Sequence, residues 1–176
     1  MPPTIAFDES KMSQGLVSGP LQALPACVVQ RADGIWRVHG HGRFSWSVFR
    51  IYNAALWVRQ SFSWQDAFIL DLAYLRNVST SQIVDASIQE MHRLRQIETL
   101  KLTQWRDELY GFVPNVGLGD RLLGLFEPGI GVTFFSQDEI LGQIRDVVFV
   151  DAFAAVWLDP STKAPQLRSA LLGDNA

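Results

Sequence analysis

Two arginines on strand-like hydrophobic segments are the residues of this chain best suited to hold an acidic group beside apolar surface. Arg50 lies inside SVFRIYNAALWV, residues 47–58, and Arg43 comes shortly before that segment. A guanidinium offers a planar fork of donors that fits a carboxylate, and low dielectric strengthens the contact. An inward-facing arginine needs an anionic partner, because an unpaired buried charge costs several kcal/mol. One hypothesis is therefore that Arg43 or Arg50 binds an acidic ligand at the mouth of an apolar cleft.

A structural role competes with this hypothesis. Either arginine can face solvent or pair with an acidic side chain of the protein, and Asp71 and Glu90 are the candidate partners. Charged side chains are almost never fully buried without such a partner. The residue types leave the two interpretations open.

Two tyrosines and a third arginine complete the predicted binding residues. Tyr52 and Tyr74 lie on apolar segments, and each hydroxyl can either bond a ligand head group or be satisfied locally within the core. Arg76 ends AFILDLAYLR, residues 67–76, and serves either the pocket or the junction with the next helix. The predicted ligand-binding set is Arg43, Arg50, Tyr52, Tyr74 and Arg76.

Other chemistries lack the residues they need. A single cysteine, Cys27, excludes an intrachain disulfide, and no activating neighbour is evident for a nucleophile. His39 and His41 share a strand face, but HExxH and Cys/His clusters are absent, so we predict no metal site. We also predict no catalytic residue, no cofactor and, from a net charge of −3 without a cluster of Lys and Arg, no nucleic-acid partner.

The length of 176 residues fits one domain, which we place at residues 25–176 after an extended arm over residues 1–24. The longest apolar run, VVFVDAFAAVWL, is too short and too broken by Asp151 to cross a bilayer. The N-terminus lacks a basic region followed by an apolar core, so we expect no signal peptide in the chain as written. The compartment is then the cytoplasm, or the periplasm for a processed form.

Periodicity predicts an α+β fold with helices layered on an antiparallel sheet. Three strands are expected first, at residues 26–32, 35–59 and 67–76, the second of them long. Its apolar residues change phase near Ser47, which indicates either a bulge there or cover on both faces of its second half; we favour the two-sided cover.

Helices and further strands follow. Ser79 and Gln82 match a capping box that opens a helix to residue 95, and a second helix covers residues 97–112. EPGIG and SQDE are turns that separate three short strands. Helices at 147–158 and 165–172 end the chain, the last one begun by Pro165 and closed by Gly173.

Four stretches together resemble the bacterial chalcone isomerase-like family: VFRIYNAALWV, LDLAYLRNVSTSQIVDAS, GDRLLGLFEPGIGVTFF and FVDAFAAVWLDPSTKAPQLRSALLG. The resemblance runs from about Trp36 to Gly173. It implies an open-faced β-sandwich, in which a large antiparallel sheet carries a layer of helices on one face and a ligand lies in a cleft between them. Plant members include chalcone isomerases as well as fatty-acid-binding relatives without catalysis.

The resemblance argues against the isomerase reaction here. It places the substrate-holding arginine of the plant enzyme at Arg43 or, one residue on, at Phe44, and the enzyme's threonine at Tyr52. The tyrosine and asparagine of the enzyme's helix fall at Ile83 and Glu90, so the phenol that polarises the ketone is absent. We therefore expect a protein that binds a hydrophobic, fatty-acid-like small molecule without chalcone isomerase activity. The alternatives are an isomerase acting on another conjugated ketone and a ligand-free interaction module with a filled core.

Overall fold

The computed structural model describes residues 22–173, so most of the predicted N-terminal arm lies outside the described residues. One six-stranded sheet and five helices make up the described residues. In chain order, the elements are α2 (Ala26–Arg31), β1 (Arg37–Trp46), β2 (Phe49–Val58), β3 (Phe68–Tyr74), α3 (Thr80–Arg95), α4 (Thr99–Phe112), β4 (Arg121–Glu127), β5 (Gly131–Ser136), β6 (Ile140–Ile144), α5 (Val147–Leu158) and α6 (Pro165–Leu172).

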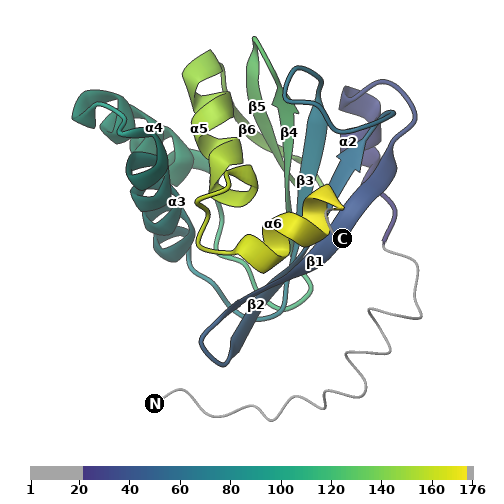
Figure 1. Cartoon of the computed structure of the whole chain (residues 1–176), viewed down its shortest axis with the longest axis horizontal. Helices are drawn as coiled ribbons and strands as arrows, with labels where there is room; N and C mark the ends of the chain where they lie inside the picture. Colours follow the sequence, from purple (N-terminus) through teal and green to yellow (C-terminus); the bar gives the residue numbers. More distant parts are fainter. Residues whose placement is uncertain (1–21, 174–176) are drawn as a thin grey trace.

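The sheet is an antiparallel meander, in which the strands lie side by side in the order β1 to β6. Helices α3 to α6 gather on one face of it, with α6 lying across β1 and α3 packed against α5 (Figure 1). The predicted α+β class, with a large antiparallel sheet under a layer of helices, is confirmed. The two helices α3 and α4 form the long connection between β3 and β4.

The prediction of one long strand at residues 35–59 is wrong, because the chain reverses at Ser47 and Val48 to form the β1–β2 hairpin. Ser47 adopts a φ of 57°, in the left-handed region that tight hairpin turns require. The sequence offers neither Gly nor Asn there, which are the residues that usually mark such a turn. The phase change near Ser47 is thus the sign of a turn. A register shift does occur nearby, since Tyr52 lies opposite Phe44 whereas Arg50 lies opposite Ser45.

The expected strand at residues 26–32 is also wrong, because this segment forms helix α2. The chain turns at Pro25, whose carbonyl accepts a hydrogen bond from the amide of Val28. The β-branched residues favour a strand, but Val28 and Ala32 lie four residues apart and bury the same helical face against the sheet. Tertiary packing therefore overrides local propensity in a helix of six residues.

The sheet is covered on both faces, as predicted for the second half of residues 35–59. Leu56 and Val58 belong to the large core beneath α3 to α6, while Ala55 and Trp57 belong to a smaller core on the opposite face. Helix α2 closes that smaller core. Strands buried on both faces are apolar at successive positions, so the alternation that normally marks a strand is lost.

The predicted helix ends are confirmed. Ser79 and Gln82 form both hydrogen bonds of the capping box at the start of α3. Pro165 occupies the first turn of α6, and Gly173 ends that helix with a φ of 76°. These local signals fix the start of α3 and both ends of α6. Residues of α3 and of the loop before α6 line the cavity described below.

Candidate functional site

A cavity of about 420 Å³ lies between the sheet and the helix layer. The sheet wall is formed mainly by Tyr52, Leu70, Leu72, Tyr74, Leu122, Gly124, Phe126 and Phe134. The helix wall is formed mainly by Ile83, Val84, Leu109, Val113, Phe153, Val156 and Trp157. Protein interiors are close-packed, so an apolar space of this size is a candidate binding site and not a packing defect.

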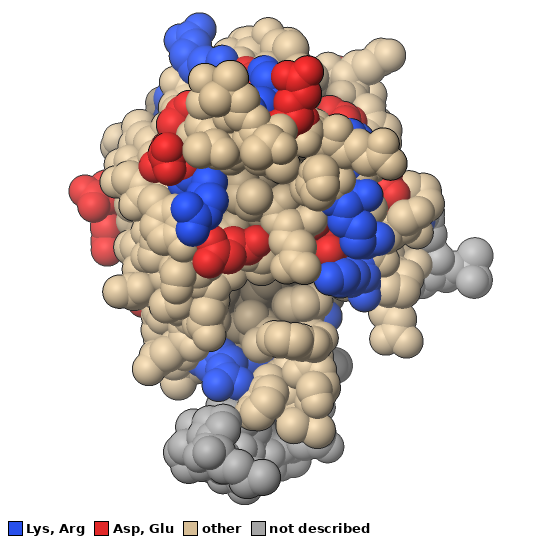
Figure 2. Space-filling view, turned by 90° about the vertical axis from the view of Figure 1, so that its left-hand side faces the viewer, with Lys and Arg blue, Asp and Glu red and all other residues tan. Residues whose placement is uncertain are grey.

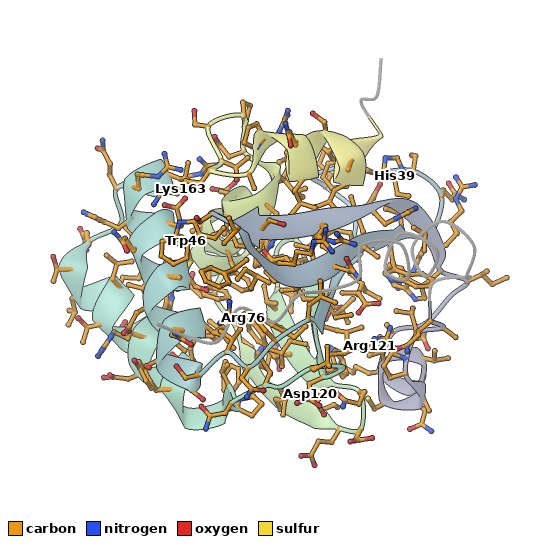
Figure 3. The ribbon with its side chains drawn as sticks, turned by 90° about the horizontal axis from the view of Figure 1, so that it is seen from below. His39, Trp46, Arg76, Asp120, Arg121 and Lys163 are labelled. Carbon is orange, nitrogen blue, oxygen red and sulfur yellow. The ribbon has the colours of Figure 1, made fainter. Side chains whose placement is uncertain are left out.

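The mouth of the cavity lies between the end of the β1–β2 hairpin, helix α3 and the loop before α6. Its exposed lining residues are Ser45, Trp46, Gln82, Ala86, Gln89 and Lys163. Trp46 and Lys163 lie close to one another on the underside of the molecule (Figure 3). The space-filling view shows a recess on the α3–α4 side, beneath a band of mixed basic and acidic side chains (Figure 2). The cavity is therefore open to a ligand at one end.

The predicted tyrosines meet inside this cavity. Tyr52 on β2 lies directly opposite Tyr74 on β3, and their rings make an edge-to-face contact with centroids 5.5 Å apart. The Trp157 indole N–H donates to the Tyr52 hydroxyl over 2.9 Å. That bond leaves the Tyr52 proton for another acceptor. Among residues 22–173 we find no hydrogen-bond partner for the Tyr74 hydroxyl.

Both phenols stay protonated. Burial raises the pKa of Tyr52 well above the usual value for tyrosine, although the bond from Trp157 acts in the opposite direction. Burial also raises the pKa of Tyr74, and the neighbouring Tyr52 adds to the increase. Because the charged form is disfavoured in both cases, the pair acts as neutral hydrogen-bond donors inside an apolar cavity.

The three predicted arginines are not among the residues that line the cavity. The Arg43 Nε donates to the Asn53 side-chain oxygen over 3.3 Å, and the residues that alternate with Asn53 along β2, such as Ala55, belong to the smaller core on the other face. The Arg76 guanidinium lies 4.5 Å from the centre of the Phe49 ring. Arg50 lies opposite Ser45 near the hairpin turn and is half-buried. The structure thus brings the tyrosines together at the cavity and leaves the arginines beside it.

The acidic residues considered as arginine partners pair elsewhere. Asp71 accepts two hydrogen bonds from Arg121, the shorter 2.6 Å long, and a third from the Trp57 indole. This pair is buried on the face opposite the cavity, where Arg121 also donates to the Ala23 carbonyl. No periodic pattern marks Arg121, because this residue begins β4 directly after a turn.

Glu90 lies at the mouth, where two cations share it. Arg93 binds both Glu90 oxygens, at 3.0 and 2.8 Å, and Lys163 contacts one of them at 3.0 Å. The Arg93 bond is the main cause that holds the pKa of Glu90 below its usual value. The cluster carries one more positive than negative charge. Sequence reasoning missed Lys163, because its segment becomes part of the mouth only when α6 packs on the sheet.

Other kinds of site receive no support from the described residues. Within residues 22–173, no group of three or more His, Cys, Asp or Glu side chains is placed to hold a metal ion. No helix in this part of the chain is long and apolar enough to cross a membrane. The cavity is therefore the feature on which a functional proposal can be built.

An antiparallel sheet under a helix layer, with an apolar cavity between them, defines an open-faced sandwich. A sequence model described as chalcone isomerase-like matches residues 29–173, and the chain belongs to this family. Ile83 and Glu90, where the resemblance places the tyrosine and asparagine of the plant enzyme, both line the cavity, and neither supplies a phenol.

Two further comparisons identify proteins similar to this chain. A Haemophilus influenzae protein described as uncharacterised is 26% identical over 146 residues, which cover 78% of this chain and 68% of the relative. The crystal structure of a fatty-acid binding protein from Arabidopsis thaliana matches with a TM-score of 0.62 at 8% identity, over 79% of this chain and 87% of that one. At this identity, the structural match shows that the fold is shared.

Proposed function

We propose that this protein binds a hydrophobic small molecule with a fatty-acid-like tail in the cavity between sheet and helices. The observation that carries the proposal is a cavity of about 420 Å³ with a predominantly apolar lining and an open mouth. Pockets for small organic ligands span about 300–1,000 Å³, so this space suits a medium-sized tail. The fatty-acid binding protein that shares the fold supports the same class of ligand.

Burial of the tail supplies the main driving force. Each methylene removed from water contributes about 0.8 kcal/mol, so a tail of about eight methylenes gains about 6 kcal/mol before the costs of association. This hydrophobic contribution to binding needs no directional contact such as a hydrogen bond. The cavity shape therefore sets which chain lengths bind.

The charged end of such a ligand belongs at the mouth. A carboxylate held deep between Phe126, Phe134 and Phe153 would lie among apolar side chains, which cannot offset its desolvation. At the mouth, the Lys163 ammonium lies in a cluster with a net positive charge and stays in contact with water. We place the head group beside Lys163 and the tail inside, with Tyr52 and Tyr74 forming part of the wall.

Titration calorimetry with dodecanoate tests this proposal. Dodecanoate is expected to bind with a negative heat-capacity change, because binding buries apolar surface, whereas butyrate is expected to bind far more weakly. Lys163→Met should weaken dodecanoate binding about two- to fivefold, as for a partly exposed ion pair, and leave dodecanol binding unchanged. Absence of dodecanoate binding, or equal affinity for butyrate, would refute the proposal.

The tyrosine pair supports a second candidate function. Two neutral donors that face an apolar cavity can polarise the carbonyl of a conjugated ketone, since both protons are available and water is largely excluded. This would make the protein an isomerase. Chalcone cyclisation should then proceed with the wild-type chain and fall at least about tenfold in Tyr52→Phe. Failure of the wild-type chain to cyclise chalcone, or equal rates in the two proteins, would leave the binding function alone.

A further inference from the structure

The turn of the β1–β2 hairpin exposes large apolar side chains to solvent. Trp46 is 75% exposed, Val48 is 86% exposed and Phe49 is 37% exposed. These residues flank or form the tight turn at Ser47, and the hairpin end projects from the body of the sheet (Figure 1). Adjacent apolar residues at a projecting tip are the kind of surface that marks an interaction site.

The hairpin that carries this tip is basic. Between Gly34 and Gln65 the sequence contains four arginines and neither aspartate nor glutamate, although the whole chain has a net charge of −3. Arg37 and Arg59 lie at the end of the hairpin away from the turn, and Arg43 and Arg50 are engaged in contacts, so the positive charge beside the tip comes from Arg76 and Lys163. Next to the tip, the Arg76 guanidinium lies 4.5 Å from the centre of the Phe49 ring. Figure 3 shows Trp46 between Arg76 and Lys163 on the same side of the molecule.

We propose that this tip docks on the surface of a bilayer that contains anionic phospholipids. Tryptophan is favoured at the membrane–water interface, because its ring is apolar and its N–H is polar. Val48 and Phe49 supply apolar area that the headgroup region can bury. Arginine and lysine beside the tip are attracted to the negative surface potential of such a bilayer. A neutral membrane offers only the first two of these contributions.

The position of the tip gives docking a consequence for the cavity. Trp46 is both an exposed tip residue and part of the cavity mouth. A protein docked through this tip presents the mouth to the bilayer, so an apolar ligand can pass between them with little exposure to water. This consequence rests on the proposed ligand binding, whereas the docking itself does not.

Flotation with lipid vesicles tests the docking, using the full chain with vesicles of phosphatidylcholine and of phosphatidylcholine mixed with phosphatidylglycerol. The wild-type protein should float with the mixed vesicles, float less with phosphatidylcholine alone, and be released as salt is raised. Val48→Glu should lower the bound fraction at least about tenfold, because it places a carboxylate at the point of insertion. Val48 does not line the cavity, so dodecanoate affinity in the absence of vesicles should be unchanged.

Ile35→Glu is the matched control. Ile35 is 88% exposed, has a similar branched side chain and lies before β1, at the opposite end of that strand from the turn. It should bind vesicles like the wild-type protein. Equal loss in both variants, no flotation of the wild-type protein, or a dimer in solution that Val48→Glu disrupts would each overturn the proposal. If vesicles bind but dodecanoate does not, docking stands and the proposed ligand is wrong.

Discussion

Replacing Arg121 with leucine is expected to lower the free energy of unfolding by about 3–5 kcal/mol, the cost typical of removing one partner from a buried ion pair. Both side chains of the Asp71–Arg121 pair are 8% exposed, and their shorter contact is 2.6 Å. Without Arg121, the Asp71 carboxylate would keep the Trp57 indole as a donor but lose its counter-charge. Urea unfolding followed by circular dichroism measures the change as a lower midpoint at a similar slope.

Two comparisons make this result specific to burial. Arg106→Leu removes an ion pair with Asp85 at 3.3 Å, in which both side chains are about half exposed, and should cost at most about 1 kcal/mol. Combining Asp71→Leu with Arg121→Leu should recover much of the loss, because no charge is then left buried. Equal destabilisation by Arg121→Leu and Arg106→Leu would show that the buried pair is not a major source of stability.

Filling the cavity with a larger side chain is expected to abolish most ligand binding while the protein stays folded. Ile83 on α3 lines the cavity and is half-buried, so Ile83→Trp places an indole in the space proposed for the tail. Excluding two or three methylenes removes about 2 kcal/mol, so dodecanoate affinity should fall at least about tenfold. Titration calorimetry gives the affinity, and circular dichroism checks the fold.

Ser81→Trp provides the matched control for this variant. Ser81 lies on the same helix, two residues away, but it is exposed and does not line the cavity. Its affinity for dodecanoate should equal that of the wild-type chain. Undiminished binding by Ile83→Trp would mean that the ligand does not occupy the cavity beside α3.

Most of the fold could be predicted from the sequence, because its signals are local. The capping box at Ser79, the Pro165 start and the Gly173 end of α6, and the EPGIG turn each act within a few residues, and the structure contains all of them. The segments that were predicted wrongly are those whose conformation depends on packing against residues far away in the chain. Helix α2 forms because Val28 and Ala32 pack against a face of the sheet. The turn at Ser47 lacks the glycine or asparagine that usually indicates a tight hairpin turn.

The candidate site could be predicted only in part. Tyr52 and Tyr74 were found because they lie on apolar strands, and their meeting follows from the β2–β3 register. The arginines could not be assigned to a face of the sheet, because the register shift near Ser45 and Arg50 decides where each side chain points. Trp157 reaches the cavity from α5 and Lys163 from the loop before α6, a pairing of segments far apart in the chain that residue patterns do not encode.

The meander order of the sheet has a consequence for how the protein folds. Four of the five strand pairings join strands separated by short turns or loops, whereas β3 and β4 are separated by residues 75–120. Closing that long segment carries the largest loop entropy of the five pairings. We therefore expect two three-stranded units to form early, with their association at β3–β4 as the slow step in refolding.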